Sequence, residues 1–296
     1  MLFRSVKDNL ALSRAGYQAM APALDVLAAV PARGDATVAA GAVEEWGRLH
    51  DSLATDPAEQ ARLGKLIAKQ WRPRMAALGF EPRSREILPD AQLRGALIAM
   101  LGKQGDAKVA AEARRRFAAL AGNPRALDGP LKTAWLRIVA GNATPAEWDA
   151  LAALAKASSG LVEKSTYYGL LGRASDPALA QATLDLALTD TPPQTVRAAM
   201  IRQVAEGHAD LAFAFAMAHR AQIEALVDDS SQASYFAGLA AAAQAPATIA
   251  ALEAYAAGLK PDQRKPVNRV LGQIRQRLAD NAAQVAGTKA WLARRK

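Results

Sequence analysis

Apolar residues recur at intervals of three and four along most of the chain. Leu93, Leu97 and Met100 follow this spacing, and so do Leu151 and Leu154. Side chains at these intervals lie on one face of an α-helix, whereas half-buried strands alternate apolar and polar residues. Alternation over the length of a strand is scarce in this sequence. The pattern therefore predicts a series of amphipathic helices and an all-α fold.

Helix starts are marked by a capping residue followed directly by proline. Asp56 to Glu59 and Thr144 to Glu147 also place a glutamate three residues after the cap, and Thr191 to Gln194 places a glutamine there. Asp176 followed by Pro177 is a fourth start. The cap side chain accepts a hydrogen bond from an amide of the first turn, and proline lacks only an N–H that this turn leaves unbonded. We expect a helix to begin at each of the four.

Helix ends are marked by glycines that follow apolar runs, because glycine adopts left-handed backbone angles at little cost. The glycines predicted to end helices in this way are Gly16, Gly79, Gly105, Gly122, Gly160, Gly207 and Gly258. Start and stop signals together predict helices at residues 4–15, 20–30, 37–54, 57–78, 90–104, 107–121, 130–140, 145–158, 161–174, 177–188, 192–206, 209–227, 231–243, 246–257 and 262–285.

This succession of short helices and tight connections predicts antiparallel helix pairs. The fixed period of about 34 residues of tetratricopeptide arrays is missing, so an irregular HEAT- or armadillo-like solenoid fits better. We expect a single helical-repeat domain over residues 1–296. The segment 79–90 carries two prolines and several charges, and is a possible break between two lobes. The alternative is a long loop between two helices.

Composition agrees with closely packed helices. The hydrophobic fraction is 51% but aromatics make up only 5%, and much of the apolar content is alanine, a strong helix former with a small side chain. Cysteine is absent, which excludes disulfides and thiolate metal sites. The formal charge of +9 permits attraction to nucleic acid, anionic lipid or acidic proteins. The positive residues are scattered over many predicted helices, however, as on an ordinary solvated surface.

The apolar stretches are short compared with the roughly 20 residues that span a bilayer. Among the longest are Leu211 to Ala218 and Ala237 to Ala243. Met1 to Val6 lacks the apolar core of a secretory signal. We therefore expect a soluble domain without a transmembrane segment, and the sequence leaves its compartment open between the cytoplasm, the periplasm and secretion.

Histidines are the first candidates for metal binding, and there are three, His50, His208 and His219. They form neither a His-Glu-x-x-His motif nor a pair at helical ligand spacing. His208 could share a turn with Asp210, and His219 could join them from a distance. One histidine and one carboxylate fall short of a closed metal site, so we expect surface or capping roles.

Two acidic pairs, Glu44-Glu45 and Asp228-Asp229, are candidates for a general acid and base. Adjacent residues on a helix point in different directions, which disfavours joint acid–base chemistry. We expect these carboxylates to be solvated. The second pair also predicts an N-terminal cap for the helix that follows it.

A nucleophile or a nucleotide site finds little support either. Ser158-Ser159-Gly160 lacks the strand–turn–helix context and the flanking glycines of a nucleophile elbow. Neither a Walker A loop nor a G-x-G-x-x-G fingerprint is present. No residue is therefore assigned to catalysis, to a cofactor or to a metal.

Basic and aromatic residues do not interleave as they do in single-strand nucleic-acid sites, so nucleic-acid binding is disfavoured. The densest positive segments are Arg114 to Arg116, Arg294 to Lys296, and a stretch that contains Lys260, Arg264, Lys265, Arg269, Arg275 and Arg277. The aromatic residues expected to pack between helices are Tyr167, Tyr168, Trp135, Trp148, Phe213 and Phe215.

Four segments resemble the C-terminal helical domain of the large zinc aminopeptidases, the group that includes aminopeptidase N and the endoplasmic-reticulum aminopeptidases. Val6 to Tyr17 is similar to the entry helix of that domain and Leu93 to Phe117 to its middle. Glu163 to Leu188 is similar to a third stretch, and Gly287 to Ala293 to the closing helix. The resemblance runs nearly end to end.

This resemblance implies a bowl of HEAT-like helix pairs that docks on a thermolysin-like catalytic domain in the same protein. The bowl would close over the active site and offer a concave face to the peptide substrate. In this family of metallopeptidases, which are hydrolases, the zinc ligands and the Gly-x-Met-Glu-Asn motif belong to the catalytic domain, and both are missing from this sequence. The resemblance therefore implies a non-catalytic domain, with zinc expected in a catalytic domain upstream, and gives no substrate-binding residue.

Three functions follow as hypotheses. The first is the C-terminal domain of a zinc aminopeptidase, which shapes peptide access through sterics and through arginines or lysines on its concave wall. The second is a free-standing helical-repeat scaffold that binds a segment of another protein. The third and weakest is a basic nucleic-acid-binding solenoid, whose binding would depend steeply on salt.

Overall fold

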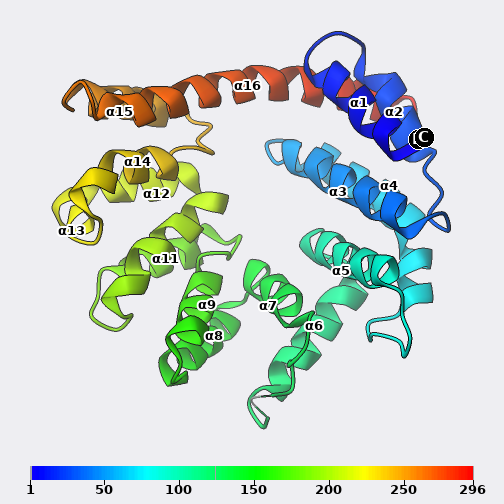
Figure 1. The fold of residues 1–296 in the computed structure, drawn as a ribbon, viewed down its shortest axis with the longest axis horizontal. Helices are drawn as coiled ribbons and strands as arrows, with labels where there is room; N and C mark the ends of the chain where they lie inside the picture. Colours follow the sequence, from blue (N-terminus) through cyan, green and yellow to red (C-terminus); the bar gives the residue numbers. More distant parts are fainter. Residues whose placement is uncertain (1, 124, 296) are drawn as a thin grey trace. The chain divides into compact units, whose positions relative to one another are not determined.

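The structure is a computed structural model that describes residues 2–123 and 125–295, with side chains described from residue 6 onward. Sixteen α-helices and no β-strand occur in this part of the chain (Figure 1), so the predicted all-α class is confirmed. The chain divides into two compact units. Unit 1 comprises residues 1–138 and 279–296, and unit 2 comprises residues 139–278. The loop 79–90, where the sequence suggests a possible break, lies inside unit 1.

Unit 1 is built from helices that pair with their neighbours along the chain. α1 packs against α2, and α3 packs against both α4 and α5, which in turn packs against α6. The helices are α1 (Leu2–Arg14), α2 (Met20–Ala28), α3 (Ala36–Ser52), α4 (Pro57–Leu78), α5 (Leu88–Lys103), α6 (Ala107–Ala119), most of α7 (Lys132–Gly141) and the end of α16 (Arg264–Ala293).

Unit 2 continues the same construction with shorter helices. α8 packs against α9, α10 against α11, and α11 also packs against α9, α12 and α14. The helices are α8 (Pro145–Ala157), α9 (Leu161–Leu171), α10 (Pro177–Ala187), α11 (Gln194–Gly207), α12 (Ala209–Ala218), α13 (Arg220–Glu224), α14 (Asp229–Leu239), α15 (Pro246–Ala257) and the first part of α16. These neighbour contacts within each unit confirm the predicted series of helix pairs.

Large aromatic side chains fill both cores, although they are few. In unit 1 the four tryptophans are at most 1% exposed, and the rings of Trp46 and Trp291 lie 6.0 Å apart between centroids. They are Trp46, Trp71, Trp135 and Trp291. The packing predicted for Trp135, Tyr167, Tyr168, Phe213 and Phe215 is confirmed, since all five are buried. Trp148 is half-buried, and its indole N–H donates to the Thr183 hydroxyl at 3.1 Å.

Three of the four predicted caps are confirmed. The Asp56 carboxylate accepts from the Glu59 amide at 3.2 Å, and the Asp176 carboxylate accepts from the Ala178 amide at 2.8 Å. Thr144 and Glu147 form a reciprocal capping box. These caps are local interactions, which is why the sequence alone indicates them.

The start predicted at Thr191 is wrong by two residues, because α11 has Pro193 as its N-cap and begins at Gln194. The ring of a proline disfavours helical backbone angles for the residue before it. Pro193 therefore keeps Pro192 out of the helix, and Pro192 does the same to Thr191.

The glycine signals are correct at some positions and wrong at others. Gly16, Gly79 and Gly105 have the expected positive φ, at 79°, 71° and 75°. Gly122, Gly160, Gly207 and Gly258 do not adopt a positive φ, although Gly258 does end a helix, as the C-cap of α15. Gly160 is instead the extended N-cap of α9, and Gly207 is the last residue of α11. Apolar periodicity alone does not distinguish a glycine that ends one helix from a glycine that begins the next.

Two predicted helices have the wrong extent. The helix predicted at 209–227 is two helices, because His219 leaves helical backbone angles with φ −110° and ψ 31°. Its ring packs on Phe215 instead, with 4.4 Å between ring centroids. The helix predicted to end at 285 continues to Ala293, with Gly287 inside it.

Candidate functional site

The three histidines have separate partners, and His50 Nδ1 lies 4.0 Å from the Asp51 carboxylate. The His208 ring Nε2 lies 2.9 Å from the Ala174 carbonyl oxygen, and the His219 ring contacts Gln222 and Phe215. The Asp210 carboxylate accepts from the amides of Gln244 and Ala245, both at 3.2 Å. The Asp210 carboxylate is therefore committed to backbone amides rather than to a site shared with the histidines.

Glu45 corrects the expectation that the acidic pair on α3 is solvated. Its residue exposure is only 4%, and its carboxylate accepts from Arg14 at 3.1 Å and from Arg48 at 2.8 Å. Arg14 also donates from Nε to the buried Gln284 side chain at 2.7 Å. Glu44 is exposed as expected, and among the described residues it approaches only Arg48, at 3.6 Å. The pair thus consists of one structural and one solvated carboxylate.

The other polar pairs take part in helix ends. Ser158 is the C-cap of α8, and its hydroxyl donates to the Leu154 carbonyl at 2.9 Å. Asp228 is the N-cap residue of α14, as predicted for the acidic pair, but the helix begins at Asp229 rather than at residue 231. The Asp228 side chain makes no capping hydrogen bond, however, so the capping role predicted for this carboxylate is wrong.

The arginines of α6 are partly neutralised by one carboxylate. Glu112 accepts from Arg115 at 2.8 and 2.7 Å and from Arg116 at 2.7 Å. The bond from Arg115 is the main cause that lowers the pKa of Glu112 to about 2, with Arg116 adding to it against the opposing effect of burial. The Arg116 guanidinium also lies over the Trp135 ring, 4.7 Å from its centroid.

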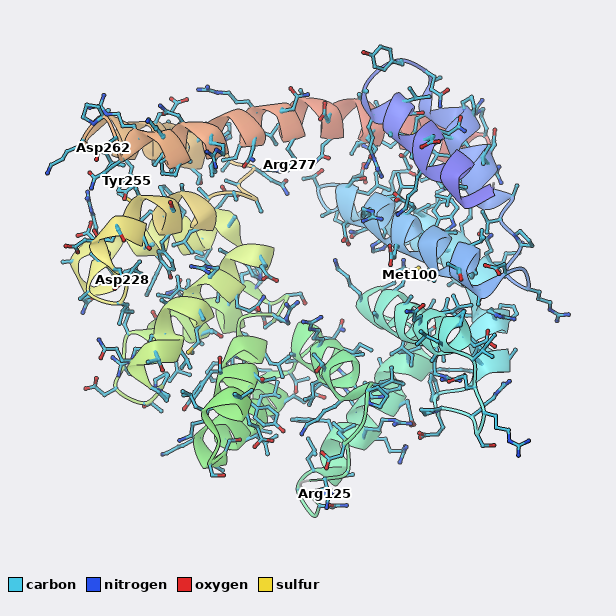
Figure 2. All side chains as sticks on the ribbon, viewed as in Figure 1. Met100, Arg125, Asp228, Tyr255, Asp262 and Arg277 are labelled. Carbon is cyan, nitrogen blue, oxygen red and sulfur yellow. The ribbon has the colours of Figure 1, made fainter. Side chains whose placement is uncertain are left out.

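Basic residues near the C-terminus mostly stabilise the fold. In unit 2, Arg264 donates to the carbonyls of Leu259 and Ala257 at the end of α15, and Arg277 donates to the Ala243 carbonyl (Figure 2). In unit 1, Arg295 pairs with Asp25 at 2.7 Å. Lys296 of the predicted basic tail lies outside the described residues.

A fully buried arginine anchors the loop after α4. Arg94 is 1% exposed and pairs with Glu86 through both ends of its guanidinium. It also donates from Nε to the Gly79 carbonyl at 3.0 Å and from Nη2 to the Leu78 carbonyl at 3.3 Å. These bonds hold both ends of the loop to α5 and so fix the position of Phe80, which is next to Gly79.

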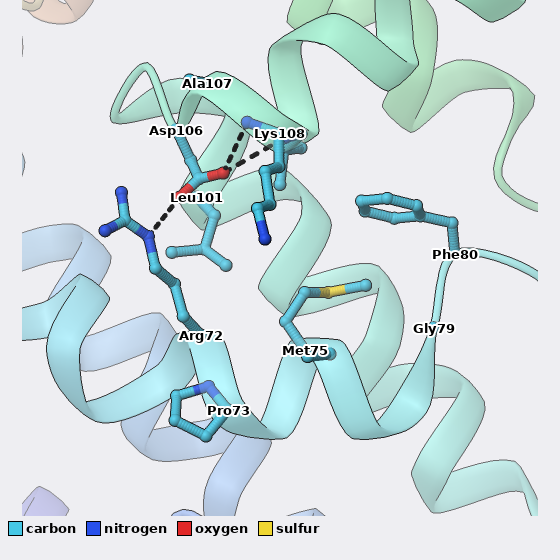
Figure 3. Close-up of a pocket in the computed structure, with 11 residues that line it drawn as sticks. Arg72, Pro73, Met75, Gly79, Phe80, Leu101, Asp106, Ala107 and Lys108 are labelled. Carbon is cyan, nitrogen blue, oxygen red and sulfur yellow. Dashed lines mark hydrogen bonds and ion pairs between the residues drawn. The ribbon is translucent and has the colours of Figure 1, made fainter.

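Phe80 forms one wall of a pocket of about 800 Å³ inside unit 1 (Figure 3). Its ring packs edge-on against Trp135, with 5.6 Å between centroids and a 75° angle between the ring planes. The pocket lies between the C-terminal half of α4 and the start of α6, and Leu101 of α5 also contributes to it. Its lining residues are Arg72, Pro73, Met75, Ala76, Gly79, Phe80, Leu101, Asp106, Ala107, Lys108 and Val109.

Three charged groups occur among these lining residues. Asp106 caps α6 through the amides of Lys108 and Val109 and pairs with Arg72 Nε at 2.5 Å. Burial raises the pKa of the Asp106 carboxyl, but the bonds from Arg72 and the amides outweigh it, and the pKa is lowered. Asp106 therefore stays ionised and fully bonded. The Lys108 ammonium has no protein partner within the described residues.

Sequence reasoning did not single out this pocket, although part of it has a sequence signal. Lys65, Lys69 and Arg72 follow helical spacing on α4 and are all exposed, so they form a basic stripe that leads to the pocket. The contact between α4 and α6 is not visible in a single sequence, since it depends on how α5 packs between them.

Within residues 2–123 and 125–295, no group of three or more histidine, aspartate or glutamate side chains is placed to hold a metal ion. In the same residues, no helix is long and apolar enough to cross a membrane.

Residues 5–280 match the family model described as the ERAP1-like C-terminal domain. The match covers nearly all of both units and agrees with the all-α arrangement of helix pairs. It also confirms the resemblance found in the first three sequence segments, while the fourth, Gly287 to Ala293, lies beyond the matched residues. The chain belongs to the family of ERAP1-like C-terminal domains, and is thus the C-terminal part of an aminopeptidase.

Proposed function

We propose that this domain covers the active site of a zinc-dependent catalytic domain and shapes how peptides reach it. The observation that carries the proposal is the family match over residues 5–280. In this account the chain performs no hydrolysis. Zinc in the catalytic domain would supply a polarised water for attack on the first peptide bond, and this chain would supply no metal ligand.

The contribution of this chain would be steric and electrostatic. A covering domain must keep its shape, and the buried Arg94–Glu86 pair and the partly buried Arg14–Glu45 pair tie separate segments together in unit 1. Exposed cations such as Lys65 and Lys69 would attract acidic groups of a passing peptide. A concave, bowl-like face would then select peptides by length, because only some peptides reach both the wall and the active site.

The test is to combine the 296-residue chain with a separately produced catalytic domain that has the His-Glu-x-x-His motif. Aminopeptidase rates are measured on leucine-initiated peptides of increasing length and on a leucine amide that cannot reach the wall. We expect the chain to be inactive alone and to change the dependence of the rate on peptide length, with a smaller effect on the amide.

Two results would contradict the proposal. One is a failure of the two parts to associate in sedimentation experiments at high concentration. The other is association that leaves the length profile unchanged. A family member's catalytic domain with its own C-terminal domain serves as the positive control.

A further inference from the structure

We propose that the pocket between α4 and α6 binds a small organic anion with an apolar or aromatic body, such as an aryl carboxylate. Lys108 and Arg72 would hold its carboxylate, and Phe80, Met75 and Leu101 would contact its body. This inference rests on the pocket alone and does not depend on the proposed peptidase role.

The lining of the pocket favours a ligand with an apolar or aromatic body. Most of the side chains around the pocket are apolar, and its volume of about 800 Å³ falls within the range of small-molecule sites. Phe80 offers an aromatic ring whose other side is already supported by Trp135. Because the Arg94 bonds to Gly79 and Leu78 hold this loop, the wall exists before any ligand arrives.

The balance of charge among the lining residues favours an anionic ligand. Asp106 is the one acidic residue among the described lining residues, and its oxygens are taken up by Arg72 Nε and two amides. The terminal nitrogens of Arg72 have no partner within the described residues, and its side chain is 60% exposed. One positive charge therefore remains uncompensated at this pocket.

Lys108 brings a positive charge next to the apolar walls of the pocket. Figure 3 shows its side chain extending from α6 into the space between Leu101 and Phe80, with its ammonium facing Met75. Lys108 is an exposed residue, so ionic attraction alone would be weak, and contact with the apolar walls would add to it. An inorganic anion would leave the apolar walls uncovered, and a neutral apolar compound would leave the ammonium unpaired. An amphipathic carboxylate would cover the apolar walls and pair with the ammonium.

The test is calorimetric titration of the full 296-residue chain with 3-phenylpropionate and, in parallel, with the neutral 3-phenylpropan-1-ol. We expect the acid to bind with a dissociation constant on the order of 1 mM and the alcohol to bind about tenfold more weakly. Equal affinities would overturn the proposal, and so would the absence of saturable acid binding up to about 20 mM.

Three variants locate the binding. Lys108→Met keeps the stem and removes the charge, and should weaken acid binding about tenfold while leaving alcohol binding unchanged. Lys65→Met removes another exposed lysine charge, on α4 and outside the pocket lining, and should leave both affinities unchanged. Ala76→Trp should fill the pocket and weaken both compounds. An equal loss in the two lysine variants would mean general charge attraction and would overturn the proposal.

A competition experiment identifies the source of the anion. A pentapeptide with blocked ends and a Glu-Phe pair is added to the protein that holds 3-phenylpropionate. Displacement would support binding of a carboxylate carried by a polypeptide, and no displacement would support binding of a free small acid. Either result retains the carboxylate chemistry, and melting curves of each variant confirm that the fold is intact.

Discussion

Buried charges connect segments of unit 1 that are far apart in the sequence. Arg14, Glu45 and Gln284 come from three different helices, and Arg94 reaches carbonyls that lie 15 and 16 residues before it. A buried ion is costly unless it is paired and hydrogen-bonded, and the two buried charges, Arg94 and Glu45, meet this condition. Loss of one partner should therefore cost more than loss of a surface pair.

Glu45→Gln should lower the free energy of unfolding by about 1–3 kcal/mol, because it removes the charge that both Arg14 and Arg48 contact. The loss of unfolding free energy stays modest because the Arg48 side chain is half exposed. Urea denaturation measures the change. Glu44→Gln, one residue earlier and 58% exposed in its side chain, is the matched control and should change stability by less than about 0.5 kcal/mol. Equal effects of the two substitutions would contradict a structural role for Glu45.

Glu86→Gln should lower stability by about 3 kcal/mol and should loosen the loop 79–90, because it leaves the Arg94 charge buried without its ionic partner. Trypsin should then cleave faster after Arg83 and Arg85 in this loop. The control is Glu81→Gln, which removes a carboxylate that is 71% exposed. Unchanged cleavage in Glu86→Gln would mean that the loop is held by other contacts.

The position of Glu45 along α3 indicates burial, although the acidic pair Glu44-Glu45 suggests two solvated residues. Glu45 follows Ala42 by three residues and precedes Leu49 by four, so it belongs to the apolar face of α3. Its register predicts burial, but nothing local identifies Arg14 as its partner. Lys108 is a similar case, since its pocket depends on a contact between helices that are not neighbours in sequence.

At the scale of the elements, glycines allow helices to approach closely. A Cβ atom on Gly287 of α16 would lie 2.5 Å from the Met20 Cβ of α2. In unit 2, a Cβ atom on Gly172 would lie 2.9 Å from the backbone nitrogen of Val204. These distances are too short for any side chain, so both glycines are required by packing and not by a turn.

Gly287→Ala should therefore destabilise the protein by about 1–3 kcal/mol, because α2 and α16 would have to separate. Gly272→Ala in the same helix is the control, since nothing lies within 4 Å of its Cβ position. It should stabilise the protein by up to about 1 kcal/mol through better helix propensity. Thermal unfolding compares the two. Stabilisation by both substitutions would show that the contact with Met20 adapts freely.

Element boundaries could be predicted where their cause is local. The caps at Asp56, Thr144 and Asp176 depend on residues within one turn, and the sequence indicates them correctly. The break at His219 has neither glycine nor proline beside it, so no local signal in the sequence indicates it. The predicted end of the last helix is wrong for the opposite reason, since tertiary packing keeps Gly287 helical.

At the scale of the whole molecule, the two units differ in charge. Unit 1 contains 25 lysines and arginines against 15 aspartates and glutamates, a formal charge of +10, whereas unit 2 contains 12 against 13, a formal charge of −1. The carboxylates with clearly lowered pKa values also lie in unit 1. They are Asp25, Asp51, Asp56, Glu86, Asp106, Glu112 and Asp128.

Acid should therefore destabilise unit 1 first. A carboxyl whose pKa is lower in the folded state stabilises the fold above its unfolded pKa of about 4, and this contribution is lost as the pH falls through the folded value. For Glu112 the window runs from 4.5 to about 2. Pepsin digestion between about pH 4 and 2 should cut unit 1 before unit 2. Earlier cleavage in unit 2 would contradict the prediction.

Unit 2 should instead lose stability at alkaline pH. Burial raises the pKa of Tyr168, Tyr235 and Tyr255 above the ordinary value. Their contribution is complete below the unfolded pKa of about 10 and is lost as the pH rises above it. Proteolysis above that pH with an alkaline-stable protease should reverse the order of cleavage seen in acid.

We propose that this chain works as the non-catalytic domain of a zinc aminopeptidase. The most direct measurement is to capture the native protein from its source cells with an antibody against this chain, and to determine its mass, peptides and aminopeptidase activity. The account predicts peptides of a catalytic domain with the His-Glu-x-x-His motif, together with leucine aminopeptidase activity that a zinc chelator removes. A species of 31.2 kDa that neither contains nor associates with such a domain would contradict it, and would favour an independent scaffold.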